Sequence, residues 1–345
     1  MSEDKWQWQT GRIWRGVGIY HVTMVVPNRM SLLGDLVIPH DDPEQAYVAR
    51  KELGEAILKL MFMIPDYHPE VEIIQFSLMP DHIHFILHVK RTMNKGIASV
   101  VRGFWQGAKK AGNLHALSIL PDNIQSHNAS SVFPNNIRSD ETEWNPIFTE
   151  KPFIRPLSCK GQLQSMIRYV QMNPQRLATK RLKPGYFCVQ ENVQIGEHTY
   201  SAVGNIKLLY AEKYAPVHVR SIWIKEAEEQ GDDKTLRIYK NACVRAAREG
   251  AVMVSPYISE HEKTVLEVLI KEKHPVIYIA DNGFGRYFKP SDALFDAVAE
   301  GRLLILSPWP YDPSKKRVSR EECVKMNGMA EEICNTLSPN AIRKN

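Results

Sequence analysis

Apolar and polar positions alternate along two neighbouring stretches of the chain, residues 71–80 and 81–89. The letters "VEIIQFSLMP" and "DHIHFILHV" are rich in β-branched and aromatic residues, which is typical of strands. Met79, Pro80 and Asp81 fall between the two runs and predict a tight turn. A third β-prone run, "GVGIYHVTMVV" at residues 16–26, predicts another strand.

Apolar residues recur at helical spacing in three further segments, residues 42–63, 94–112 and 160–178. The first has Pro43 at a first-turn position, and the second has a basic last turn before Gly112. The resulting order of β, α, β, β, α predicts a ferredoxin-like sheet with helices on one side.

The pattern changes twice further along the chain. Residues 121–147 are polar and turn-rich, which predicts a loop or an insertion. Beyond about residue 215, short apolar runs such as "AVMVSP" and "PVIYIA" alternate with helical segments, which predicts a parallel α/β sheet. We therefore predict two domains, an α+β domain at residues 1–205 and an α/β domain at residues 206–345.

Charge is distributed unevenly in this chain. The 345 residues carry a formal net charge of +5, a weak hint of an anionic partner. Two long segments, residues 82–121 and 151–190, contain no Asp or Glu. Such segments suit a phosphate backbone, although solvated helical faces are the alternative. The basic residues expected to contact DNA are Arg91, Lys95, Arg102, Lys109, Lys110, Arg155, Arg168 and Arg176.

Cysteine usage and hydropathy bear on the compartment. The five cysteines are widely spaced and form no CxxC pair, which favours a reducing compartment. The N-terminal residues are polar, and no apolar run approaches the ~18 residues that a bilayer span needs. We expect a cytoplasmic, nucleoid-associated protein with no membrane partner.

His82 and His84 are the first candidates for chemistry. Because side chains alternate along a strand, the two imidazoles share one face and Ile83 points to the other, into the core. Taken alone, such a pair is an ordinary feature of a sheet surface. In the second segment without acidic residues, 151–190, Tyr169 and Asn173 are spaced i, i+4 and share a helix face.

These residue types are sufficient for phosphodiester chemistry. Two neutral imidazoles and one amide oxygen can hold a divalent cation, Mg²⁺ or Mn²⁺, and leave positions open for phosphate oxygens. Asn173 is the expected third ligand, with Gln171 as the alternative if the helix is distorted before Pro174, and Asn173 could instead cap a new helix. Tyr169 can act as a nucleophile when cations favour its phenolate. Such a reaction needs no ATP.

The stretches "MPDHIHFILHV" and "YVQMNPQR" resemble the HUH single-tyrosine transposases, in particular the REP-associated tyrosine transposases. The resemblance covers about residues 12–203, and "QRLAT" departs from the small residues that follow Asn-Pro in relatives. It implies that Tyr169 attacks single-stranded, hairpin-bearing DNA and keeps a 5′-phosphotyrosine, while His82, His84 and Asn173 hold the metal. Dimers and monomers both occur among relatives, so a homodimer is one option. His21 and His88 are expected to be structural. Phe104 and Trp105 could stack on unpaired bases, and core packing of their helix is the expected role of one of them.

The second domain has a strand followed by Ser-Pro, then the "SEHEK" helix, and a later strand ending in "LSPW". In this it resembles, more loosely, the Rossmann-like fold of the DNA-processing protein A (Smf) family. This resemblance implies a ligand site around Ser255, Ser259, Glu262 and Lys263, where a helix start could hold a phosphate. Capping of the helix by Ser259 is the ordinary alternative. Two other functions compete with DNA cleavage: a domesticated DNA-binding or regulatory protein that cleaves little or not at all, and a nucleotide-sensing protein acting through the second domain.

Overall fold

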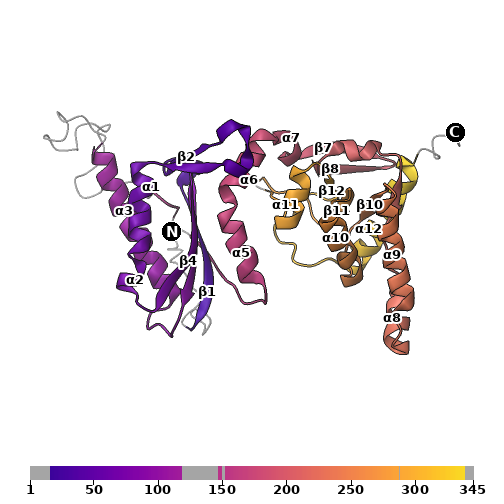
Figure 1. Cartoon of the computed structure of the whole chain (residues 1–345), viewed down its shortest axis with the longest axis horizontal. Coiled ribbons are helices and arrows are strands. Elements are labelled where there is room, and N and C mark those ends of the chain that lie inside the picture. The colour runs from indigo at the N-terminus through magenta and orange to yellow at the C-terminus, as the bar shows by residue number, and fades with distance from the viewer. Residues whose placement is uncertain (1–15, 119–146, 150–151, 287, 339–345) are drawn as a thin grey trace. The chain divides into compact units, whose positions relative to one another are not determined.

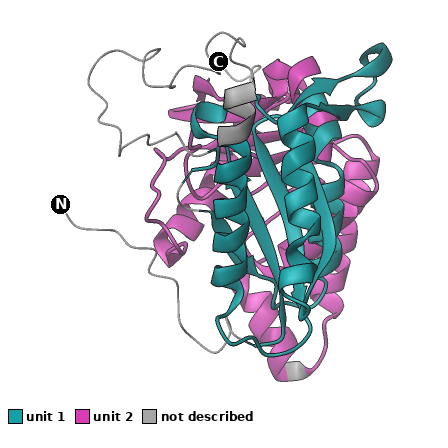
Figure 2. Cartoon of the chain, turned by 90° about the vertical axis from the view of Figure 1, so that its left-hand side faces the viewer, with its two compact units in different colours: residues 1–178 teal, residues 179–345 magenta. Residues whose placement is uncertain are grey.

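The computed structural model describes residues 16–118, 147–149, 152–286 and 288–338. The chain forms two compact units, Met1–Ala178 and Thr179–Asn345 (Figure 2). The boundary therefore lies earlier than the predicted residue 205. The reason is that β7 (Gln190–Ile195) and β8 (His198–Gly204) form a hairpin that pairs with a strand of the second unit. Most of the predicted loop at 121–147 lies outside the described residues.

The sheet of the first unit has four antiparallel strands. They are β1 (Gly18–Val25), β4 (Val71–Met79), β5 (His82–Val89) and β6 (Phe153–Pro156), in the order β4-β5-β1-β6. β5 lies between β1 and β4, and β1 lies between β5 and β6. These are two interleaved split βαβ units, which confirms the ferredoxin-like sheet. The predicted hairpin of β4 and β5 is also confirmed, since Met79 pairs with His82 across the turn.

Helices cover both faces of this sheet. α1 (Glu52–Phe62) and α3 (Ile97–Ser118) pack on the face that carries the apolar core (Figure 1). α5 (Gln162–Gln171) lies on the opposite side of the strands and contacts β4 and β5 (Figure 1). The two helices of the predicted β, α, β, β, α order therefore share one side, as predicted, and α5 covers the other face of the sheet.

The helix predicted at residues 42–63 is only half correct. Its first part is a 3₁₀ turn, η4 (Pro43–Gln45), in which the Asp42 side chain accepts from the Glu44 N–H, followed by β3 (Tyr47–Arg50). β3 pairs with β2 (Gly34–Val37), so a tertiary partner overrides the helical spacing. The remaining short elements of this unit are η2 (Pro27–Arg29), η3 (Pro39–Asp41) and α2 (Ile64–Tyr67).

Two predicted helix ends also differ. α3 continues through Gly112, where a Cβ atom would lie 2.3 Å from the Ile147 side chain. That glycine therefore serves close packing and does not end the helix. The helix predicted at 160–178 divides at Met172 into α5 and α6 (Asn173–Leu182).

The second unit contains a six-stranded sheet with the order β7-β8-β12-β11-β10-β9. The strands β9 (Tyr214–Pro216), β10 (Val252–Ser255), β11 (Val276–Ile279) and β12 (Leu303–Ser307) are parallel, as predicted. They lie in the order in which they occur in the chain. The described strands therefore lack the reversal of order at which doubly wound Rossmann folds bind ligands.

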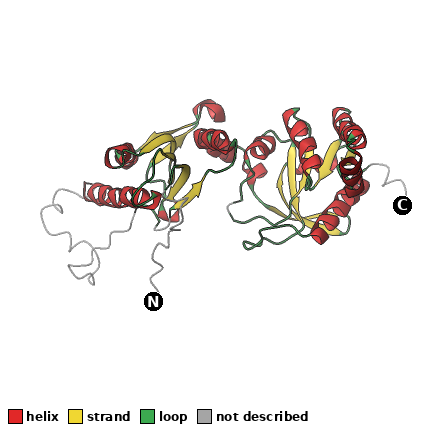
Figure 3. Ribbon diagram, turned by 90° about the horizontal axis from the view of Figure 1, so that it is seen from below, coloured by secondary structure: helices red, strands yellow, loops and turns green. Residues whose placement is uncertain are grey.

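Helices cover both faces of the second sheet as well (Figure 3). α9 (Lys234–Arg248), α10 (Glu260–Lys271) and α11 (Asp292–Ala299) pack on one face, and α12 (Arg320–Leu337) packs on the other. The other elements are α7 (Pro184–Phe187), η6 (Ile206–Tyr210) and α8 (Ser221–Gln230). Among the helices that the structure describes, none has the length and apolar character needed to cross a membrane.

Candidate active site

His82 and His84 lie side by side on β5, as the alternation predicts. Their ring centroids are 4.8 Å apart with the planes at 90°. Ile83 and Phe85 point the other way into the apolar core. Thr23 of β1 lies directly opposite His84 in the strand register. The histidine face of the sheet is therefore the face that α5 covers.

Tyr169 on α5 lies against this pair. Its ring centroid is 5.5 Å from that of His84, with the planes at 78°. Some 85 positions separate the two residues in the chain, so this meeting depends on α5 packing across β4 and β5. The structure thus brings together the phenol and the imidazoles that the sequence motifs single out.

A third histidine, His21 on β1, belongs to the same cluster. Its Nε2 lies 3.0 Å from His84 Nδ1, and its ring is edge-on to Tyr169 at 6.2 Å. Burial, together with the nearby charge of Arg155, lowers the pKa of His21 to about 4. His21 is therefore neutral at pH 7. We expected only a structural role for it; the signal in the sequence was "HVT", which places His21 and Thr23 on one strand face.

Two polar side chains hold the imidazoles through their Nδ1 atoms. Asp81 Oδ1 lies 2.6 Å from His82 Nδ1, and Thr23 Oγ1 lies 2.8 Å from His84 Nδ1. Burial acts to raise the pKa of Asp81, but the hydrogen bond and charge of His82, with Arg29 beside them, outweigh it and lower the pKa. The carboxylate is thus ionised at neutral pH. From the sequence Asp81 was expected only in the turn between the two strands, and Thr23 had no predicted role.

Asn173 lies one helical turn after Tyr169, at the first position of α6, and is only 4% exposed. In the part of the chain that the structure describes, its amide nitrogen Nδ2 has no hydrogen-bond partner. Gln171, the alternative third ligand, is exposed. Within the described residues, no group of three His, Cys, Asp or Glu side chains is arranged to hold a metal ion. Any cation here therefore needs an amide or water oxygen beside the two imidazoles.

The basic residues predicted to contact DNA lie on different sides of the first unit. Arg102, Lys109 and Lys110 are on α3, across the sheet from Tyr169, and Arg91 and Lys95 lie between β5 and α3. These five residues therefore lie away from Tyr169, and their contact with DNA stays a prediction.

The three other arginines lie nearer the cluster. Arg155 is exposed on β6 opposite His21, and Arg168 is exposed on α5. Arg176 is 4% exposed, with its guanidinium carbon 5.5 Å from the Tyr169 ring centroid. The Arg176 guanidinium thus packs over the Tyr169 ring in a buried position, and its predicted contact with DNA stays a prediction.

The aromatic pair on α3 also packs inside the unit. Phe104 is 5% exposed and belongs to the core. The Trp105 indole N–H donates to the carbonyl oxygens of Phe148 and Thr149, at 3.3 and 3.2 Å. The indole is therefore anchored to the chain, on the sheet face remote from Tyr169.

In the second unit, a carboxylate of the chain itself occupies the start of α10. The Glu262 carboxylate, 2% exposed, accepts hydrogen bonds from the backbone N–H groups of Val219, Ile258 and Ser259 at 2.9–3.0 Å. Ser259 caps the helix in return. A phosphate at this helix start would have to displace that carboxylate, so the expected phosphate site is not present in this form.

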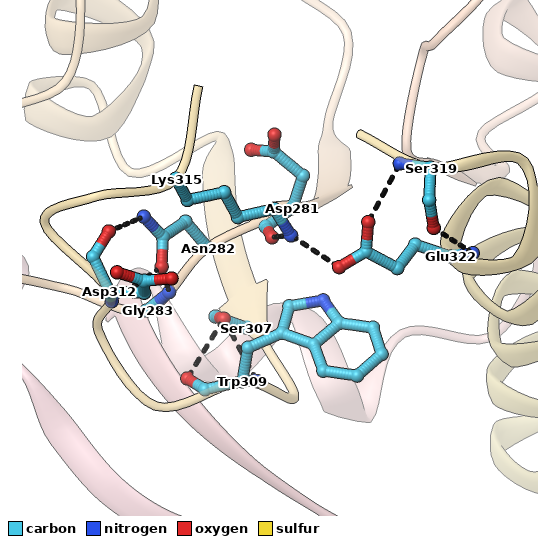
Figure 4. A network of polar contacts seen from close by, with 9 residues as sticks. All are labelled: Asp281, Asn282, Gly283, Ser307, Trp309, Asp312, Lys315, Ser319 and Glu322. Atoms are coloured by element: carbon cyan, nitrogen blue, oxygen red, sulfur yellow. Dashed lines mark hydrogen bonds and ion pairs between the residues drawn. The ribbon is translucent and has the colours of Figure 1, made fainter. Parts of the chain in front are cut away.

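A second polar network joins the loops after β11 and β12 (Figure 4). The Lys315 ammonium donates to the Asp281 carbonyl and to Glu322 Oε1, and it lies over the Trp309 ring. Asn282 bridges to the backbone of Asp312 through both ends of its amide. These contacts fasten the two loops together.

Comparisons with known proteins gave limited results. No family model matches the chain, and no match was found among curated proteins. Among solved structures, a REP-associated tyrosine transposase bound to a REP hairpin matches 50% of this chain and 73% of its own, with 16% identity and a TM-score of 0.28. A putative transposase from Deinococcus radiodurans R1 matches 48% and 98%, with 16% identity and a TM-score of 0.22. At this level the two matches establish neither a shared family nor a shared activity.

Proposed function

We propose that the first unit is an HUH-type single-tyrosine transesterase that cleaves and rejoins single-stranded, hairpin-bearing DNA. The observation that carries the proposal is the approach of the Tyr169 ring to His84, at 5.5 Å, with His82 beside them. The phenol is an oxygen nucleophile, and the imidazole pair is a ligand set for a cation. The motifs "MPDHIHFILHV" and "YVQMNPQR" support the same reading.

The residues present fit a divalent cation, Mg²⁺ or Mn²⁺. Two nitrogen ligands at ~2.1 Å from one ion lie about 3 Å apart, and imidazole centroids 4.8 Å apart allow that approach. Asn173 would add the third ligand, since an amide whose nitrogen has no partner can turn to present its oxygen. A bound cation would supply Lewis-acid polarisation of the phosphate.

The chain's own residues would then perform the transfer. The Tyr169 oxygen attacks phosphorus, an oxygen–phosphorus bond to tyrosine forms, and the bond to the 3′ oxygen breaks. The phenol gives up its proton, and the leaving oxygen takes one up as a 3′-hydroxyl. The Arg176 guanidinium over the ring favours the phenolate. Because the phosphodiester energy is kept in the 5′-phosphotyrosine, rejoining needs no ATP.

A labelled hairpin oligonucleotide with a single-stranded flank, incubated with Mg²⁺ or Mn²⁺, tests the proposal. We expect a covalent adduct on a denaturing gel that Tyr169→Phe abolishes. Tyr67→Phe is the matched control, since it removes a phenol that is 71% exposed on α2 of the same unit. An adduct that survives in Tyr169→Phe would contradict the proposal.

DNA binding by the wild-type protein without any adduct would instead support a domesticated DNA-binding or regulatory protein. In either case we propose that the protein works at DNA in the cytoplasm, as a monomer or a homodimer. Nucleotide sensing by the second unit is less well supported, because Glu262 already occupies the start of α10.

A further inference from the structure

We propose that Asp81, Thr23 and His21 are positioning residues that fix the tautomers of His82 and His84, so that both imidazoles offer Nε2 to the cation. This inference rests on the proposed function. It goes further by naming three residues that neither the motifs nor the comparisons assign. Each of them acts through an imidazole and none needs to touch DNA.

The orientation of His82 follows from its contact with Asp81. An ionised carboxylate only accepts hydrogen bonds, so His82 Nδ1, at 2.6 Å from Oδ1, must carry the hydrogen. In a neutral imidazole the lone pair is then on Nε2. The other oxygen of Asp81 accepts from Arg29 at 3.3 Å, so the carboxylate is held from both sides.

The backbone fixes the position of Asp81. Its carbonyl oxygen accepts from the Val26 N–H at 2.8 Å, and the Pro80 carbonyl accepts from the Leu33 N–H at 3.0 Å. The turn between β4 and β5 is thereby tied to two neighbouring segments. Asp81 consequently has little freedom to leave His82, and a rigid support of this kind keeps a ligand in a productive orientation.

The orientation of His84 follows from β1. His84 Nδ1 lies 2.8 Å from Thr23 Oγ1 and 3.0 Å from His21 Nε2. In the proposed chain, His84 Nδ1–H donates to the threonine hydroxyl, and that hydroxyl donates onward to His21 Nε2, 3.5 Å away. His21 then carries its hydrogen on Nδ1. His84 is thus held through Nδ1, as His82 is.

The same strand provides a matched control. His88 on β5 lies 3.8 Å from Glu72 Oε2 in the first unit, and that carboxylate is 57% exposed. This pair has the chemistry of the Asp81–His82 pair without the cluster around it. Glu72→Gln therefore removes a carboxylate beside a β5 histidine without changing the site.

Mn²⁺ binding by the full chain, measured by electron paramagnetic resonance without DNA, tests the inference. We expect Asp81→Asn and Thr23→Val each to weaken Mn²⁺ binding by about 10- to 100-fold, the range typical for partners of metal ligands. Thr23→Ser, which keeps the hydroxyl, and Glu72→Gln should bind within about twofold of wild type. Unchanged binding in both Asp81→Asn and Thr23→Val would overturn the inference.

A second readout needs no metal. Nitrogen-15 NMR of the imidazoles should show His82 with its hydrogen on Nδ1 in the wild type, and a larger Nε2–H fraction in Asp81→Asn. A wild-type His82 with its hydrogen on Nε2 would overturn the inference. The proposed function fails separately, if the wild type binds no Mn²⁺ and forms no tyrosine adduct, because the tautomers are measured without either.

Discussion

Acid should destabilise the first unit through His21. The pKa of this side chain is about 4 in the folded protein and 6.5 as its ordinary value, because burial and the charge of Arg155 oppose protonation. Above pH 6.5 both states are neutral and no stability is lost. As the pH falls from 6.5 to 4, the unfolded chain takes up a proton that the folded chain refuses. At pH 4.5 the two pKa values give a loss of about 2.5 kcal/mol.

Hydrogen exchange of the β1 and β5 amides, in the presence of a chelator, reports the opening of this unit. The difference in opening free energy between pH 7 and pH 4.5 should shrink by about 2.5 kcal/mol in His21→Asn relative to wild type. His88→Gln is the control, because the His88 side chain is 35% exposed. If His21→Asn lost as much opening free energy between pH 7 and pH 4.5 as the wild type, the reasoning would be refuted.

Three further outcomes are expected. Gly54→Ala should destabilise the first unit by about 3 kcal/mol in chemical unfolding, because the new Cβ would lie 2.0 Å from a backbone carbonyl oxygen. Gly103→Ala, which meets nothing within 4 Å, should not. In Glu322, the hydrogen bond from Lys315 lowers the pKa to about 2, so its stabilising contribution is complete above pH 4.5 and is lost as the pH falls through 2. Glu322→Gln should therefore flatten the acid dependence of α12 amide exchange over that range, and an unchanged slope would contradict this. Arg176→Met should slow adduct formation about tenfold, as expected for the loss of a desolvated cation–π contact, and an unchanged rate on the hairpin substrate would count against it.

The sequence was informative where local patterns decide the structure. Alternation placed His82 and His84 on one face, and the Pro80–Asp81 turn joined the correct strands. The alternating strands and helices of the second unit predicted its parallel sheet. In these cases the buried face and the turn chemistry are written into neighbouring residues.

The sequence could not predict structure that depends on contacts with residues far away in the chain. Residues 47–50 are a strand because residues 34–37 pair with them, and no period within residues 42–63 shows that. The side of the sheet that α5 covers is likewise set by packing. The meeting of Tyr169 with the imidazoles was implied by the resemblance of two motifs to a known family, whereas His21 entered the cluster only through the pairing of β1 with β5.

The buried carboxylate of Glu262 limits how the second unit could recognise anything. A helix start whose amide hydrogens already serve an internal acid repels a further negative group, since that group would meet like charge before reaching a donor. Triphosphates and nucleic-acid backbones are therefore expected to bind poorly at the start of α10. Screens for ligands at the start of α10 should therefore use neutral or cationic compounds. Binding of polyanions to this unit should be sought on its other surfaces.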